Sequence, residues 1–92
     1  MPVDVRVPTV LRKHTAGEKR ITGDGATLRE LVDDVATRNP GLRGALVGED
    51  GQLHRFVNVY VNDEDVRYLK GLDTEVGSGD LVAVVPAVAG GT

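Results

Sequence analysis

The fold is decided by residues 79–92, which read Gly79-Asp80-Leu81-Val82-Ala83-Val84-Val85-Pro86-Ala87-Val88-Ala89-Gly90-Gly91-Thr92. Residues 81–85 are almost continuously apolar, which predicts a strand buried on both faces, central in its sheet and paired in parallel. We expect Pro86 to end that strand. Residues 87–92 carry no side chain able to build a core, so they are expected to form a flexible tail after a domain of residues 1–86.

The tail has a composition suited to a narrow cleft. Gly90 and Gly91 lack a Cβ, so the backbone can enter such a cleft fully extended. Six residues beyond Pro86 reach roughly 20 Å at about 3.3–3.6 Å each. A carboxylate at the end of this tail could therefore enter a partner's active site. A frayed terminus has the same composition, and the tail alone does not decide between the two.

Composition excludes several classes of protein. The net charge is −3, with lysine and arginine scattered along the chain, which argues against nucleic-acid partners and against an anionic membrane surface. Aromatic residues make up only 3%, so the core must consist of Val, Leu, Ile and Ala. The absence of cysteine excludes disulfides, thiolate chemistry and cysteine-ligated iron–sulfur clusters. Without a signal peptide or an apolar run of about 20 residues, we expect a cytoplasmic protein, and a mobile donor favours a monomer.

Period-two and helical patterns place the other elements. The valines at positions 3, 5 and 7 alternate with polar residues, which predicts a strand. Residues 19–22 are expected to form a second short strand that pairs with it in antiparallel orientation. Residues 9–13 are expected to form a loop from which Leu11 reaches the core. Thr27 and Glu30 form a capping-box signature. The apolar stripe of one helix follows, at Leu28, Leu31, Val32, Val35 and Ala36.

The strongest strand signal is residues 56–62, Phe-Val-Asn-Val-Tyr-Val-Asn. Its valines are assigned to the core, which leaves Phe56 and Tyr60 on the opposite face. Residues 62–65 are expected to turn and residues 66–67 to form a short return strand. Leu72 and Val76 are expected to anchor the connection of residues 71–79. A single main helix packed across one face of a mixed sheet gives an α+β fold of the β-grasp, ubiquitin-like type.

Three segments carry a resemblance to a known family. They are residues 59–67 (VYVNDEDVR), residues 79–82 (GDLV) and residues 85–91 (VPAVAGG). Together they resemble the ubiquitin-like sulfur carriers that include ThiS and MoaD, over nearly the whole chain. Residues 7–12 (VPTVLR) and 53–60 (LHRFVNVY) make the chain most similar to the CysO type of this family, which serves cysteine biosynthesis.

The resemblance implies a carrier rather than an enzyme, with no bound cofactor. An ATP-dependent adenylating partner would activate the carboxylate of Gly91, and a sulfur donor would convert it to a thiocarboxylate. The tail would then enter a sulfur-accepting synthase, a PLP-dependent cysteine synthase in the CysO type, and a metalloprotease-type hydrolase would release the product. The residues inserted into the partner would be Val88, Ala89, Gly90 and Gly91.

One residue departs from the family pattern. The family's working form ends in Gly-Gly, whereas Thr92 follows Gly91 here. A peptide carbonyl at Gly91 cannot be adenylated, so we expect a hydrolase to cleave between Gly91 and Thr92. The alternative is that Thr92 has no role.

The helix-free face is the expected docking surface for a partner. Exposed aromatic residues often anchor interfaces, which singles out Phe56 and Tyr60, flanked by Arg55 and Arg67 as groups that would steer acidic partners. The alternative is that a loop around Leu69 and Leu72 covers the aromatic side chains.

No metal site is expected, because His14 and His54 fit no metal-ligand spacing. Two other functions remain open: a modifier joined to lysines through Gly91, and an interaction domain with an inert tail. The acceptor pathway also stays open, since thiamin, molybdopterin or another sulfur metabolite would use the same tail.

Overall fold

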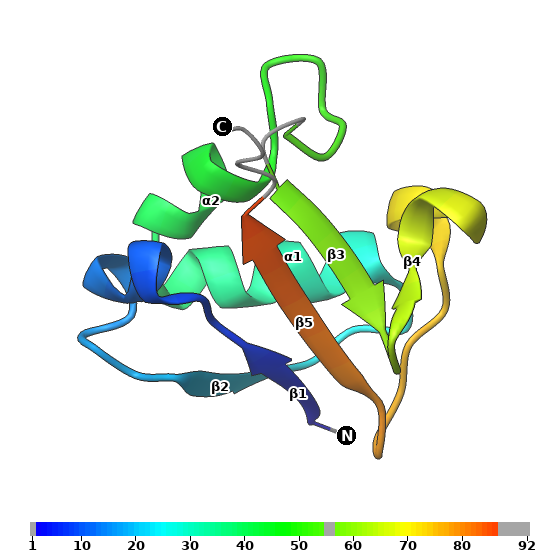
Figure 1. The fold of residues 1–92 in the computed structure, drawn as a ribbon, viewed down its shortest axis with the longest axis horizontal. Helices are drawn as coiled ribbons and strands as arrows, with labels where there is room; N and C mark the ends of the chain where they lie inside the picture. The colour runs from blue at the N-terminus through cyan, green and yellow to red at the C-terminus, as the bar shows by residue number, and fades with distance from the viewer. Residues whose placement is uncertain (1, 55–56, 87–92) are drawn as a thin grey trace.

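The computed structural model describes residues 2–54 and 57–86. The helices and strands are, in chain order, β1 (Val3–Arg6), β2 (Arg20–Gly23), α1 (Leu28–Arg38), α2 (Gly41–Leu46), β3 (Val57–Val61), β4 (Glu64–Asp65) and β5 (Leu81–Pro86). Three short 3-10 helices connect them: η1 (Thr9–His14), η2 (Val66–Tyr68) and η3 (Gly71–Asp73). Figure 1 shows α1 lying behind a sheet whose other face is turned to the viewer.

The strands form one mixed sheet in the order β2-β1-β5-β3-β4. β5, the last strand in the sequence, lies in the centre, parallel to β1 and antiparallel to β3. The predicted central position and parallel pairing are therefore confirmed, and with them the α+β β-grasp arrangement (Figure 1).

The predicted helix forms with its capping box. Thr27 accepts a hydrogen bond at its Oγ1 from the Glu30 backbone N–H (3.3 Å), and Glu30 accepts at Oε1 from the Ala26 N–H (2.9 Å). The reciprocal bond thus reaches one residue further back than in the usual box. The apolar stripe is fully buried, as predicted: Leu28, Leu31, Val32, Val35 and Ala36.

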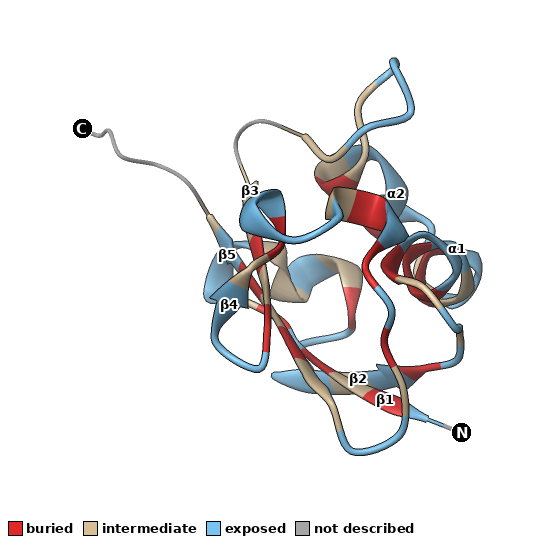
Figure 2. Cartoon of the chain, turned by 90° about the vertical axis from the view of Figure 1, so that its right-hand side faces the viewer, coloured by how far each residue is buried: buried red, intermediate tan, exposed pale blue. Residues whose placement is uncertain are grey.

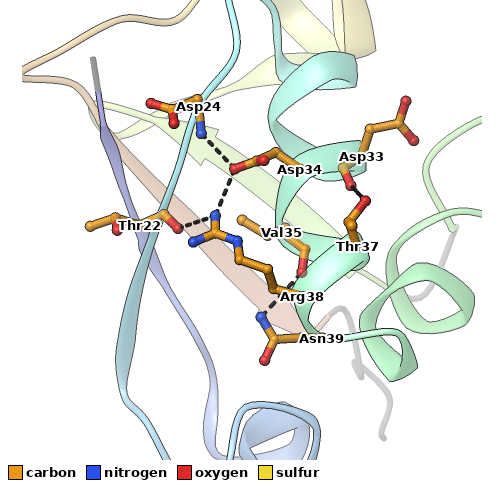
Figure 3. A network of polar contacts seen from close by, with 8 residues as sticks. All are labelled: Thr22, Asp24, Asp33, Asp34, Val35, Thr37, Arg38 and Asn39. Carbon is orange, nitrogen blue, oxygen red and sulfur yellow. Dashed lines mark hydrogen bonds and ion pairs between the residues drawn. The ribbon is translucent and has the colours of Figure 1, made fainter.

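A polar network ties α1 to β2 (Figure 3). Arg38 donates from Nη2 to the Thr22 carbonyl (2.8 Å) and to Asp34 Oδ2 (2.6 Å), and the Asp24 N–H donates to the same carboxylate oxygen (2.8 Å). At Gly23, an added Cβ would meet Val35 Cγ1 at 2.7 Å, so glycine permits this close approach. The β1–β2 hairpin is thereby held in a defined position on the helix.

The core lies on one face of the sheet only. Val82 and Val84 of β5 are buried beneath the helices, whereas Val85 is 41% exposed and Leu81 and Ala83 are half-buried. The expectation that β5 is buried on both faces was wrong, because both helices pack on the same side of the sheet. Figure 2 shows the buried residues gathered between the sheet and the helices.

Pro86 ends β5, as predicted, but it is itself the last residue of the strand and lies opposite Val57, because a last residue needs no further ladder N–H. Two other local expectations need correction. Residues 9–14 form η1 rather than a loop, although Leu11 does pack against the core. The return strand is Glu64–Asp65 rather than residues 66–67.

The shift of the return strand has a local cause. Asn62 and Asp63 have φ angles of 52° and 73°, which makes a two-residue turn of type I′ and lets pairing resume at Glu64. Asp65 then caps η2 by accepting a hydrogen bond from the Arg67 N–H (2.9 Å), and the chain leaves the sheet.

Candidate functional site

The chain leaves the described fold at Pro86, the final residue of the central strand. The residues predicted to work as the tail, Val88, Ala89, Gly90, Gly91 and Thr92, lie outside the described residues. Arg55 and Phe56 of the predicted docking face lie outside them too. The described site is therefore the surface around Pro86.

One row of side chains crosses the whole sheet on the face without helices. Cross-strand neighbours point to the same face of a sheet. The register pairs Arg20 with Arg6, Arg6 with Ala83, Ala83 with Tyr60, and Tyr60 with Asp65. The outer face thus changes from two cations at the β2 edge, through a small residue in the centre, to an aromatic ring and a carboxylate at the β4 edge.

The small side chain of Ala83 leaves an open hollow of about 650 Å³ on this face. Val85 and Pro86 line the end from which the tail departs, and Tyr60 lines one wall. The opposite side is lined by residues of β1, η1 and the link between them: Arg6, Val7, Pro8, Thr9, Val10 and Arg12. Asp63, of the turn between β3 and β4, also lines the hollow. The hollow is apolar at Val10, which is 59% exposed, and polar at its rim.

Tyr60 lies where the sequence predicted it, on the helix-free face. Leu72 packs in the core, and Leu69 is 41% exposed. The side chain of Tyr60 is half-buried and lines the hollow. The structure therefore presents part of this aromatic side chain at the outer face.

Arg67 is bound to a neighbouring carboxylate. Its Nη2 donates to Asp65 Oδ2 (2.8 Å) and its Nε lies 3.2 Å from both carboxylate oxygens. The side-chain hydrogen bonds lower the pKa of Asp65 and raise the pKa of Arg67. The charge predicted to steer partners is thus neutralised locally.

The cations that sequence reasoning missed are Arg6 and Arg12. Arg6 is exposed, and Arg12 is held in place by donating from Nε to the Val7 carbonyl (3.2 Å). The alternation of Val3, Val5 and Val7 already placed Arg6 on the outer face. The position of Arg12 depends on η1, and residues 9–14 show no periodic pattern that would predict this helix.

Asn58 supplies an unusual polar group beside the tail exit. It lies opposite Val85, and its side-chain oxygen Oδ1 is buried with no hydrogen-bond partner among the residues that the structure describes. Most buried polar atoms are paired, so an unpaired one in a native fold needs an explanation.

Within residues 2–54 and 57–86, no group of three or more His, Asp or Glu side chains is placed to hold a metal ion. No helix in this part of the chain has the length and apolar character needed to cross a membrane.

Comparison with known proteins gives consistent similarities. The chain is 47% identical to the sulfur carrier protein CysO of Mycobacterium tuberculosis, covering 99% of this chain and all of that protein. A chain in the crystal structure of an Amycolatopsis orientalis BexX/CysO complex superposes with a TM-score of 0.90 at 55% identity, covering 97% of this chain and 99% of that one. Small archaeal modifier protein 3 of Haloferax volcanii is 35% identical over 99% of this chain and its own full length.

The family itself is matched from the first strand to the second glycine of the tail. Residues 5–91 match the ThiS family, a span that begins within β1 and includes the central strand and Gly90-Gly91. The β-grasp fold, the near-complete coverage and the full-length relatives agree. The chain belongs to the ThiS family of sulfur-carrier proteins.

Proposed function

We propose that this protein is a sulfur carrier of the CysO type that delivers sulfur from a thiocarboxylate on Gly91. The observation that carries the proposal is the continuity of the central strand with the tail: β5 ends at Pro86, and the family match continues to Gly91. The compact domain stays outside the partner while the glycines enter its active site.

The chemistry follows from the poor reactivity of a carboxylate as an electrophile. An adenylating partner joins the Gly91 carboxylate to the α-phosphate of ATP and releases pyrophosphate, which gives an acyl-adenylate. A sulfide nucleophile then attacks the acyl carbon and displaces AMP. The chain contains no cysteine whose thiolate could intercept the acyl group. ATP is thus a substrate of the partner, and the carrier supplies the acyl group without acting as an enzyme.

We propose three kinds of partner: the adenylating enzyme, a sulfur-accepting synthase, and a hydrolase acting at the C-terminus. The similar CysO of Amycolatopsis orientalis was crystallised with BexX, which supports a stable complex between such a carrier and another protein. A synthase of the PLP-dependent, cysteine-forming type is the acceptor proposed from the similarity to CysO.

The partner would dock on the outer face around Tyr60 and Ala83. This surface adjoins Pro86, and its hollow offers room for a protruding apolar side chain. Phe56 and Arg55 would extend it, and Arg67 would border it beyond Asp65.

Removal of Thr92 would precede activation. Any residue joined to Gly91 by a peptide bond blocks its carboxyl group. A hydrolase acting between Gly91 and Thr92 would expose it.

The test compares chains that end at Gly91 and at Thr92, each incubated with the adenylating enzyme from the same cells. We expect ATP–pyrophosphate exchange only with the chain ending at Gly91. With sulfide, its intact mass should rise by the exchange of one oxygen for one sulfur. Gly90→Ala should reduce the exchange, whereas Gly44→Ala, at an open position of α2, should not. Activation of the chain that retains Thr92 would refute the processing step.

A second function is favoured by the similarity to small archaeal modifier protein 3. The same acyl-adenylate could be attacked by a lysine amine of another protein, which gives an isopeptide bond. The two functions can be distinguished by purifying an epitope-tagged form of this chain from cells under denaturing conditions and analysing the purified proteins by mass spectrometry. Peptides branched at lysine through Gly91 would support the modifier, and a thiocarboxylate without them would support the carrier.

A further inference from the structure

Although Lys and Arg are scattered along the sequence, five of the eleven belong to the segment that forms one side of the sheet. Residues 2–23 contain five Lys or Arg and two Asp or Glu, a net charge of +3 in a chain whose total is −3. Arg6 lies on β1, Arg12 and Lys13 lie on η1, and Arg20 lies on β2, with Lys19 immediately before it. The opposite edge, at β4, carries Asp63, Glu64 and Asp65.

The arginines of this edge also differ from the others of the described structure in forming no ion pair there. Arginines elsewhere in the described structure form ion pairs: Arg29 with Asp73, Arg38 with Asp34, Arg43 with Asp33, and Arg67 with Asp65. Among residues 2–54 and 57–86, no carboxylate forms an ion pair with Arg6, Arg12 or Arg20.

Arg6 and Arg20 moreover face each other directly across the β1–β2 ladder, and both are exposed. Like charges at directly opposed positions destabilise a sheet. The isolated domain gains nothing from this arrangement, so the positive charge has no evident structural purpose.

The position of the cations relative to the tail suggests their role. Arg6 lies beside Ala83, three residues before Pro86, and Arg6, Arg12 and Pro86 line the same hollow. Five residues, 87–91, span at most about 18 Å when extended. When an enzyme takes Gly91 into its active site, the surface around the active-site entrance must therefore lie close to Pro86 and to the arginines beside it.

We propose that Arg6, Arg12 and Arg20 form a cationic rim that docks against an acidic surface beside the active-site entrance of the adenylating enzyme. The inference rests on the proposed function and names the chemistry of the partner's surface. With the exposed Asp63 and Glu64 toward the other edge, the charge pattern also fixes the orientation of docking, since a reversed carrier would bring its carboxylates against the partner's carboxylates.

The test measures ATP–pyrophosphate exchange by the adenylating enzyme with chains ending at Gly91, as a function of carrier concentration and salt. Arg6→Glu and Arg20→Glu should each lower kcat/KM at least about ten-fold at low ionic strength, because steering by charge raises encounter rates by such factors. The loss should appear in KM with kcat retained, and it should shrink as salt screens the charges. Lys70→Glu is the matched control: it makes the same change of charge at an exposed residue near the other edge and should leave kcat/KM near the wild-type value.

A second readout separates docking from folding. Each reversal replaces the repulsion between positions 6 and 20 with attraction, so the melting temperature should rise while kcat/KM falls. A variant that was merely damaged would lose both.

Several outcomes overturn the inference. Unchanged kcat/KM in both arginine variants would show that the adenylating enzyme does not bind the cationic rim. A decrease in kcat/KM for Lys70→Glu equal to that of the arginine variants would show the same. Loss of binding to a duplex DNA oligonucleotide with unchanged exchange would assign the cations to nucleic acid instead. If the chain that ends at Gly91 and is otherwise unchanged supports no ATP–pyrophosphate exchange, the proposed function is refuted. The docking inference is then refuted too, because it rests on that function.

Discussion

Asp65 holds the guanidinium of Arg67 from only two residues away, and the same carboxylate caps η2. One oxygen accepts the Arg67 N–H at 2.9 Å, and the other accepts from Nη2 at 2.8 Å. The side chain of Asp65 is only 9% exposed, whereas that of Arg67 is 63% exposed. A nearly buried carboxylate thus anchors the end of β4 and the start of η2.

The first prediction concerns acid stability. Since the pKa of Asp65 is lowered in the folded protein, its carboxylate contributes stability above the unfolded pKa of about 3.9, and that contribution is lost as the pH falls through the folded pKa. Between about pH 5 and pH 2, urea titrations should show the free energy of unfolding falling more steeply for wild type than for Asp65→Asn. The double variant Asp65→Asn/Arg67→Gln should show the same pH dependence of the free energy of unfolding as Asp65→Asn alone. Parallel curves for all three proteins would contradict this assignment.

The second prediction uses two asparagines in contrasting settings. Asn58→Leu removes a buried oxygen without a partner and should raise the free energy of unfolding by about 1 kcal/mol. Asn62 accepts from the Leu81 N–H at 3.0 Å, donates to Asp80 Oδ1 at 2.9 Å and has a φ of 52°. Asn62→Leu should therefore lower the free energy of unfolding by about 1–2 kcal/mol. Urea denaturation measures both, and destabilisation by Asn58→Leu would indicate that its oxygen has a partner in solution.

The third prediction concerns the start of α1. Thr27→Ala removes the side-chain acceptor of the Glu30 N–H and should lower the free energy of unfolding by about 1 kcal/mol. Thr37→Ala is the control, because Thr37 is exposed on the same helix and bonds only the Asp33 carbonyl; it should change stability by less than about 0.5 kcal/mol. Equal effects of the two substitutions in thermal unfolding would show that the cap contributes little.

The fourth prediction concerns docking at the outer face. Tyr60→Ala enlarges the hollow and removes an aromatic contact, so the Kd for the adenylating enzyme should rise by about ten-fold or more, in the range of interface anchors. Tyr68→Ala, at a residue that is 85% exposed on η2, should leave the Kd unchanged. Calorimetric titration gives both values, and circular dichroism checks that the fold is retained. An unaltered Kd for Tyr60→Ala would remove this residue from the interface.

Long, periodic signals were sufficient to predict the architecture. The stripe from Leu28 to Ala36 and the alternation at Val3, Val5 and Val7 each identify one buried face, and the structure buries those faces. The apolar run of β5 identified the central strand correctly, but hydropathy does not state how many faces are covered. Only the placement of both helices on one side shows why Val85 is exposed.

The side-chain contacts at the site could not be predicted from the sequence. Arg67 looked available for steering, because nothing in a linear pattern shows that Asp65 turns its carboxylate back toward it. The pairing of Arg6 with Arg20 needs the register of two strands separated by η1. Gly90 and Gly91 were found from sequence because their chemistry requires no fold, whereas the hollow beside Pro86 exists only once β1, β5 and β3 are aligned.

The place of β5 in the chain has a consequence for synthesis. The β1–β2 and β3–β4 hairpins have no direct ladder to each other, and the strand that joins them is made last. Until residue 86 has emerged, β1 and β3 each present an unpaired edge, so the sheet cannot close on a growing chain. Chains broken off early lack both the joining strand and the diglycine, and quality control can remove them as unfolded protein. Completion of the domain thus comes only a few residues before the diglycine, so a partner that binds the folded outer face would meet carriers that also possess Gly90 and Gly91.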